Sequence, residues 1–217
     1  MIFLTENIKF PPVHTASSDG VVAVGGDLSP ERLKEAYRQG IFPWFDQGSL
    51  ILWWSPDPRM VLYPSEVKIS KSMRAVFRKK LFKITYNTAF HQVIENCAKI
   101  ERNEQDGTWI DNDMIAAYTK LHDLGWAKSV EVWHKDELVG GLYGVDLGHI
   151  FCGESMFSKM SNASKAAFIF LAEKAEKENY KLIDCQLYTD HLASLGAREI
   201  PREVFMSILE SNNLGSI

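Results

Sequence analysis

The chain has 217 residues, of which 46% are apolar and 24% are charged, and its formal net charge is −4. These values are typical of a soluble globular protein, and no window reaches the 18 apolar residues of a membrane span. Three cysteines (Cys97, Cys152 and Cys185) are too few for a disulfide framework, and Met1-Ile-Phe-Leu-Thr-Glu6 lacks the features of a secretory signal. We therefore expect a cytoplasmic protein without a membrane segment.

The first predicted helix covers residues 31–39. Ser29-Pro30 provides a helix cap followed by proline at the first helical position, and Gly40 ends the helix. Residues 42–58 contain three prolines and three tryptophans, which predicts an irregular loop. We place the boundary of a small N-terminal domain near residue 60, which gives domains 1–60 and 61–217.

The next predicted helix, over 69–80, carries an unusual concentration of positive charge. Seven basic residues lie between Lys68 and Lys83, and no acid occurs from Val67 to Ile94. Without these seven charges the formal net charge would fall from −4 to −11. A basic cluster on an otherwise acidic protein is typical of a surface that binds a phosphate backbone. The alternative is a charged helix face that is merely solvated.

The remaining pattern predicts a mixed sheet flanked by helices. In chain order it contains helices over 90–100 and 111–124, strands over 128–134, 138–145 and 149–157, a helix over 163–178, a strand over 181–187 and a last helix from Pro201. Three antiparallel strands, a helix and another strand form the core order of the GNAT acyltransferase fold. The fold class is therefore α+β, with a mostly antiparallel GNAT-like sheet and a small N-terminal domain.

The last predicted strand places an acid and an amide in a segment that should be buried. Because strand side chains alternate between faces, Asp184 and Gln186 share the face opposite to Cys185. Buried polar groups are costly unless each finds a partner, so the pair indicates either chemistry or a polar contact that fixes the strand.

Six motifs follow one another from about residue 20 to about residue 200. They are Gly25-Gly-Asp-Leu-Ser-Pro30, Gly40-Ile-Phe-Pro-Trp44, Leu52-Trp-Trp-Ser-Pro-Asp-Pro-Arg59, Gly107-Thr-Trp-Ile110, Phe151-Cys-Gly-Glu-Ser-Met-Phe157 and Leu182-Ile-Asp-Cys-Gln186. Together they resemble the leucyl/phenylalanyl-tRNA–protein transferase family. The resemblance implies a GNAT-like fold. It also implies transfer of Leu, Phe or Met from aminoacyl-tRNA to proteins with N-terminal Arg or Lys, which marks these proteins for N-end-rule degradation.

The resemblance also implies roles for individual residues. Asp184 and Gln186 match the reaction centre, where a proton must be removed from the attacking α-amine. Glu154 is the candidate for recognising the cationic acceptor, and Trp44 and Trp109 match the residues that contact the 3′ adenosine. The predicted donor side-chain pocket consists of Leu142, Phe151, Met156, Leu171 and Ile183. The predicted tRNA surface consists of Lys71, Arg74, Arg78, Lys79 and Lys80.

Two other functions are compatible with parts of this pattern. A coenzyme A-dependent N-acetyltransferase would share the fold, but residues 158–164 lack the glycine that a phosphate-binding turn needs. There we expect Ser161 or Asn162 to be a plain helix cap. A non-catalytic tRNA-binding module would not need the Asp184–Gln186 pair.

An activated ester needs neither ATP nor metal, and no histidine or cysteine has metal-ligand spacing, so we predict no cofactor and no metal. We expect a monomer, because no heptad pattern is present. We also expect a C-terminal element of the family to be reduced or missing after Ile217.

Overall fold

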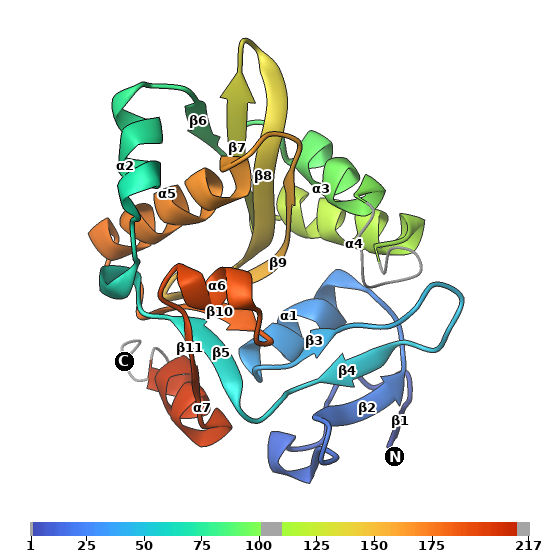
Figure 1. The fold of residues 1–217 in the computed structure, drawn as a ribbon. Coiled ribbons are helices and arrows are strands. Elements are labelled where there is room, and N and C mark those ends of the chain that lie inside the picture. The colour runs from blue at the N-terminus through green and yellow to red at the C-terminus, as the bar shows by residue number, and fades with distance from the viewer. Residues whose placement is uncertain (1, 101–109, 212–217) are drawn as a thin grey trace.

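The computed structural model of the protein describes residues 2–100 and 110–211 and contains two β-sheets with surrounding helices (Figure 1). The smaller sheet has the strand order β1-β2-β4-β3. Its strands are β1 (Phe3–Leu4), β2 (Val21–Gly25), β3 (Phe42–Pro43) and β4 (Leu52–Trp54). No helix within the described residues is long and apolar enough to cross a bilayer.

In the N-terminal part the helix predicted over residues 31–39 is confirmed, whereas the irregular loop predicted over residues 42–58 is not. Helix α1 (Pro30–Arg38) begins after Ser29, whose side chain accepts a hydrogen bond from the Arg32 amide. Residues 42–58 were expected to be irregular, yet β3 and β4 pair within them. Tryptophan side chains explain the difference, because the Trp53 indole donates to the Gly25 carbonyl at 2.8 Å and fixes β4 beside β2. Pro43 is tolerated because β3 is an edge strand.

The larger sheet has seven strands in the order β11-β5-β10-β9-β8-β7-β6. Their bounds are β5 (Arg59–Leu62), β6 (Lys83–Tyr86), β7 (Ala127–His134), β8 (Glu137–Asp146), β9 (Ile150–Ser158), β10 (Leu182–Gln186) and β11 (Arg198–Ile200). The hairpins β7–β8 and β8–β9 are antiparallel, as predicted. Helix α5 (Ala163–Lys177) then returns the chain to β10, which pairs parallel with β9. This order confirms the GNAT-like fold class.

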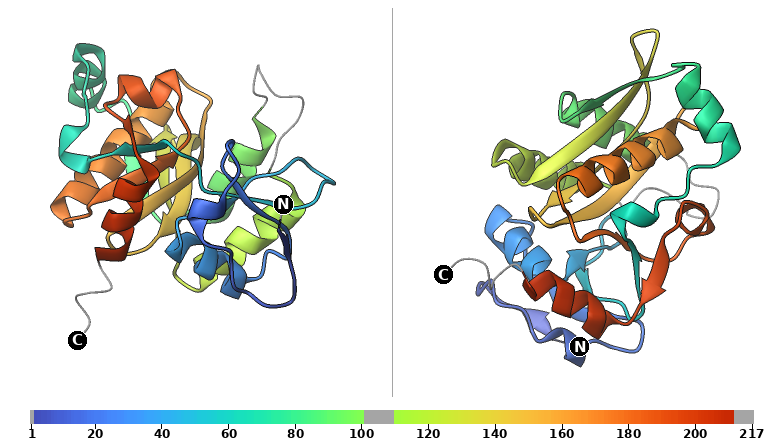
Figure 2. Two further views of the ribbon diagram at one scale, coloured as in Figure 1. Left: turned by 90° about the horizontal axis from the view of Figure 1, so that it is seen from below. Right: turned by 90° about the vertical axis from the view of Figure 1, so that its left-hand side faces the viewer.

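Helices cover both faces of the larger sheet (Figures 1 and 2). Helices α3 (Phe90–Lys99) and α4 (Asn112–Asp123) pack on one face, and α2 (Lys71–Arg78) and α5 pack on the other. The predicted helices over 69–80, 90–100 and 111–124 are therefore confirmed to within two residues at each end. The short helix α6 (Asp190–Ser194) precedes β11, and α7 (Arg202–Glu210) follows it.

The predicted domain boundary near residue 60 falls inside β5, just after the chain has passed from the smaller sheet to the larger one. One cluster of buried residues contains Phe42 and Trp53 from the N-terminal part together with Tyr118 and Tyr143 from the larger part. The boundary therefore stays a prediction, and the two parts share one core.

Candidate active site

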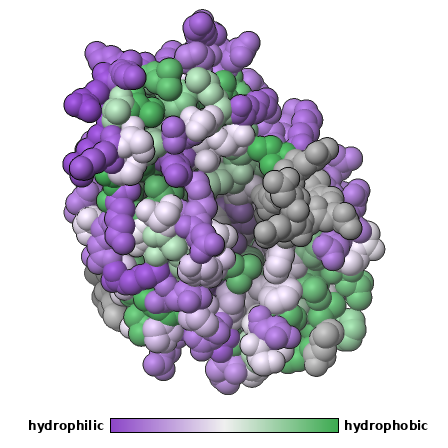
Figure 3. Space-filling view, in the orientation of Figure 1, coloured by the Kyte–Doolittle hydropathy of each residue, from purple (hydrophilic) through white to green (hydrophobic). Residues whose placement is uncertain are grey.

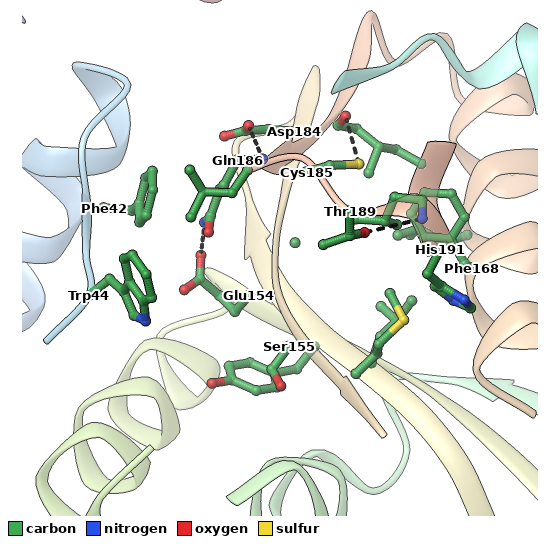
Figure 4. A pocket seen from close by; sticks show the side chains of 18 of the residues that line it. Phe42, Trp44, Glu154, Ser155, Phe168, Asp184, Cys185, Gln186, Thr189 and His191 are labelled. Atoms are coloured by element: carbon green, nitrogen blue, oxygen red, sulfur yellow. Dashed lines mark hydrogen bonds between the residues drawn. The ribbon is translucent and has the colours of Figure 1, made fainter. Parts of the chain in front are cut away.

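A cavity of about 480 Å³ lies where the N-terminal part meets the larger sheet (Figure 4). Strands β9 and β10, helix α5 and the segment 187–192 form much of its wall, and Trp44 lies across from Glu154 and Gln186. In Figure 4, Phe42 and Trp44 lie on one side of Glu154 and Gln186, whereas Phe168 and His191 lie on the other. The cavity thus joins a polar centre, formed by Glu154 and Gln186, to an apolar compartment beside Phe168.

Glu154 is the ionisable group at the polar centre. Only 9% of this residue, the candidate for acceptor recognition, is exposed. Tyr118 Oη donates to Glu154 Oε2 at 3.0 Å, and Gln186 Nε2 donates to Glu154 Oε1 at 2.8 Å. Burial raises the pKa of Glu154 to about 7, although hydroxyl and amide donors oppose this increase. The carboxyl group can therefore bind or release a proton near neutral pH.

Asp184, two residues before Gln186 on β10, forms a buried ion pair with Arg59. Arg59 Nε donates to Asp184 Oδ1 at 2.8 Å, and Arg59 Nη2 donates to Asp184 Oδ2 at 2.7 Å. The exposed fractions of the two side chains are 2% for Arg59 and 1% for Asp184. Arg59 is on β5, which pairs with β10, so the strand pairing itself brings the two charges together. The bidentate geometry is the strong form of this interaction.

Gln186 ends β10 in an unusual backbone conformation. Its φ is +66°, a left-handed value that few non-glycine residues adopt, and the pairing register shifts between Asp184 and Gln186. The Gln186 amide N–H donates to Asp184 Oδ1 at 3.0 Å, which holds this turn in place. Among the described residues, the side-chain amide oxygen of Gln186 accepts no hydrogen bond, so it is free to accept one from a substrate.

The apolar compartment contains four of the five residues predicted for the donor pocket. Leu142, Met156, Leu171 and Ile183 line the cavity. Phe151 was predicted beside them but is 1% exposed in the core and is absent from the described lining. Its ring instead approaches Gly144 on β8, where a Cβ would lie 2.5 Å from it.

Phe168 and Leu192 also line the compartment and were not predicted. Phe168 precedes Leu171 by three residues on α5, so helical periodicity could have identified it. No comparable signal was available for Leu192, which reaches the cavity from the short helix α6.

Comparison with known proteins assigns this architecture to a family. A model of the leucyl/phenylalanyl-tRNA protein transferase family matches residues 61–210, and a model of its N-terminal domain matches residues 26–57. The chain belongs to the leucyl/phenylalanyl-tRNA–protein transferase family. Membership of this family indicates aminoacyl transfer from tRNA to protein N-termini, and it decides against the coenzyme A-dependent acetyltransferase and the non-catalytic tRNA-binding module.

Curated relatives and a solved structure are similar to this transferase over most of its length. A leucyl/phenylalanyl-tRNA–protein transferase of Flavobacterium johnsoniae is 64% identical over 97% of this chain and all of the relative. One of Syntrophobacter fumaroxidans is 55% identical over 96% of this chain and 89% of the relative. Among solved structures, a GCN5-related N-acetyltransferase from Kribbella flavida is 8% identical with a TM-score of 0.38, covering 78% of this chain and 60% of the other.

Of the two tryptophans predicted to contact the adenosine, the described residues include Trp44. Trp44 is half-buried, lines the cavity and packs against Trp54 with ring centroids 5.3 Å apart. Its backbone carbonyl accepts a hydrogen bond from the Trp54 indole at 2.6 Å, which fixes its position. Trp109 lies outside the described residues.

The basic residues predicted to bind tRNA gather on and just after α2. Their side chains are exposed, and the hydropathy surface in Figure 3 is strongly hydrophilic over this helix. None of the five forms an ion pair with another described residue. They are Lys71, Arg74, Arg78, Lys79 and Lys80. This leaves a row of positive charge available to a polyanion, as the sequence indicated.

Cys185 and the turn before α5 offer less chemistry. Burial raises the pKa of the Cys185 thiol, whose sulfur donates to the Ile183 carbonyl at 3.8 Å. Cys185 packs with the α5 side of the sheet, opposite to Asp184, as strand alternation predicted.

Asn162 occupies the cap position of α5, but its side chain makes no capping bond. Ser158 Oγ instead accepts from the Ser164 amide at 3.4 Å. The described residues contain no cluster suited to a metal ion.

Proposed function

We propose that this transferase moves Leu, Phe or Met from aminoacyl-tRNA to the α-amino group of proteins that begin with Arg or Lys, and so marks them for degradation. One observation carries the proposal, which is that a single cavity joins an apolar compartment to the Glu154–Gln186 pair. The apolar compartment suits the side chain of an apolar donor, and the Glu154–Gln186 pair suits a cationic amine. We further propose that it acts as a cytoplasmic monomer.

The reaction requires little beyond alignment and the handling of one proton. The α-amine nitrogen forms a bond to the ester carbonyl carbon, and the ester bond to the tRNA ribose breaks. One amine proton must leave nitrogen, and the departing ribose oxygen must gain one. Holding both reactants in a reactive geometry removes much of the entropic cost. The ester is already activated, so no cofactor is needed.

Gln186 and Glu154 are suited to the amine. The Gln186 side-chain nitrogen donates to Glu154, so its amide oxygen is the group that can accept a hydrogen bond from the attacking nitrogen. An ionised Glu154 supplies negative charge for the ammonium form of the acceptor and for the proton as it departs. A pKa of about 7 suits this task, because a proton acceptor is most effective when its pKa lies near the working pH.

Asp184 acts through Gln186 in this proposal. The family resemblance places it at the reaction centre beside Gln186. Its carboxylate is already satisfied by two bonds from Arg59 and one from the Gln186 backbone, which favours a positioning role. The ion pair would then keep Gln186 in its left-handed conformation with the amide oxygen toward the cavity.

The donor enters the apolar compartment in this account. Leu142, Leu171 and Ile183 are almost fully buried, whereas Met156 is partly exposed and can adapt to either a branched or an aromatic side chain. Trp44 at the cavity provides a face on which the 3′ adenine can stack, an interaction that contributes about 1–3 kcal/mol per base. Phosphates of the acceptor stem would contact the α2 surface without reading its sequence.

A transfer assay with matched peptides tests the proposal. The enzyme is incubated with radiolabelled Leu-tRNA and with peptides that differ only in the first residue, which is Arg, Lys, Ala or Glu. Label should pass to the Arg and Lys peptides, and Phe-tRNA and Met-tRNA should serve as donors where Val-tRNA and Ile-tRNA are poor. Equal labelling of all four peptides would overturn the acceptor proposal, and equal use of all donors would overturn the donor proposal.

A further inference from the structure

A continuous row of hydrogen bonds joins the N-terminal part of the chain to the polar centre. Tyr37 on α1 bonds through its hydroxyl to the Tyr118 hydroxyl on α4, which donates to Glu154 on β9. Glu154 in turn accepts from Gln186 on β10. Tyr37 is 2% exposed and Tyr118 is fully buried, so water does not compete for these bonds. Four separate elements thus converge on one carboxyl group.

The direction of these bonds follows from counting protons. A tyrosine hydroxyl carries one hydrogen, and Tyr118 uses it toward Glu154 Oε2 when the carboxylate is ionised. The Tyr118 oxygen must then accept from Tyr37, which makes Tyr37 the terminal donor. Each bond in such a row polarises the next, so Tyr37 strengthens the bond that Tyr118 donates.

Glu154 needs these donors because its surroundings otherwise disfavour a negative charge. Burial is the largest effect, and Asp184 on β10 adds a like charge that also raises the pKa of Glu154. Arg59 on β5 pairs with Asp184 and offsets that charge, whereas Cys152 on β9 is a buried thiol whose own pKa is raised by burial. Against these stand the hydroxyls of Tyr37 and Tyr118 and the Gln186 amide, which lower the pKa of Glu154.

We propose that Tyr118 and Tyr37 are positioning residues for the transfer reaction, which hold Glu154 as a carboxylate beside Gln186. The inference rests on the role proposed above for Glu154. It also explains why the small N-terminal part belongs to the active site, because α1 supplies the terminal donor of the row. The alternative is that the two rings only fill the core, where Tyr118 packs edge-on against Tyr143 with centroids 5.6 Å apart.

The pH dependence of kcat/KM separates these two roles. Tyr118→Phe keeps the ring and removes only the hydroxyl, so packing is preserved. If the hydroxyl holds Glu154 ionised, the acidic limb of the profile should move to higher pH by about one unit, the scale of one hydrogen bond to a charged group. Tyr37→Phe should move it in the same direction by less. Tyr180→Phe is the matched control, because it removes a 2.7 Å tyrosine–carboxylate bond to Asp146 outside the cavity.

A second change at position 118 retains the hydroxyl. A direct titration of the Glu154 carboxyl distinguishes a failure of the tyrosine role from a failure of the role proposed for Glu154. Incorporating 3-fluorotyrosine at position 118 makes the hydroxyl a stronger donor, so the acidic limb should move to lower pH. Carbon-13 NMR titration of the Glu154 carboxyl reports the same shifts without any turnover. The inference would be overturned if the Glu154 titration were unchanged in Tyr118→Phe, in Tyr37→Phe and in the protein with 3-fluorotyrosine at position 118. If the titration shifts but Glu154→Gln transfers at the wild-type rate, the inference about the tyrosines stands as electrostatics and the role of Glu154 fails.

Discussion

Replacing Asp184 by Asn would remove the one charge that pairs with buried Arg59 among the residues that the structure describes. The two residues share bonds of 2.8 and 2.7 Å, and Arg59 Nη1 has no hydrogen-bond partner among the described residues. The guanidinium also lies against the rings of Phe42 and Phe205, at 4.8 and 4.6 Å from their centroids. These rings offer only a weak substitute for a carboxylate.

The expected cost is large compared with the stability of a typical domain. Breaking a buried ion pair by removing one partner costs about 3–5 kcal/mol, and domains are stable by about 5–15 kcal/mol. We therefore expect Asp184→Asn to lose about 3–5 kcal/mol of unfolding free energy in urea and about 10²-fold in transfer rate, the scale of a misplaced reacting group. Glu178→Gln is the matched control, because it removes a partly exposed pair with Lys174 and should cost less than about 1 kcal/mol.

The double variant Arg59→Met/Asp184→Asn decides how Asp184 acts. It removes both charges and keeps an oxygen that can accept from the Gln186 backbone. Replacing both members of a buried pair is often neutral for stability, so unfolding should return toward the wild type. If Asp184 only positions Gln186, the transfer rate should recover as well. A double variant with wild-type stability but the full loss of rate would refute the positioning role and return Asp184 to the chemical step.

Three further predictions concern the donor, the tRNA and proton binding. Ile183→Ala should change the Leu:Phe:Met ratio of transfer rates by about 1–3 kcal/mol, and an unchanged ratio would remove Ile183 from the pocket. Replacing Lys71, Arg74 and Arg78 together by Glu should weaken tRNA binding and flatten its salt dependence while sparing an aminoacyl-adenosine donor; normal tRNA affinity would mean a merely solvated surface. The pKa of Glu154 is raised from 4.5 to about 7, so the folded state binds its proton more tightly. This contribution to the stability of the wild type is complete below pH 4.5 and is lost as pH rises through 7. The free energy of unfolding of Glu154→Gln should therefore rise by about 3 kcal/mol relative to that of the wild type between pH 4.5 and 7. A difference that does not change with pH would contradict the raised pKa.

Local signals predicted the helices well because each signal lies within the helix it defines or directly beside it. Ser29 caps α1 through its side chain, and Gly40, which follows this helix, adopts a left-handed conformation. Strands β6 and β11 had no comparable signal. Each is at most four residues long and lies at an edge of the sheet, so its partner strand rather than its own pattern defines it.

The polar centre shows the same division between local and distant information. Strand alternation predicted that Asp184 shares a face with Gln186, but not that its partner is Arg59, 125 positions earlier. The left-handed turn at Gln186 is equally invisible to a period of two. The ring of Tyr118 is fully buried on the inner face of α4. Its hydroxyl has a partner only because α1 and β9 approach it in the folded chain.

The central claim is that this cavity joins an aminoacyl group to a free α-amine. Single-turnover transfer from radiolabelled Leu-tRNA to one Arg-initiated peptide, offered either free or acetylated at its α-nitrogen, tests that claim most directly. We expect label on the free peptide, none on the acetylated peptide, and an amide bond to the first residue by mass spectrometry. Label on the acetylated peptide, or attachment at the Arg side chain or at an internal lysine, would contradict the account.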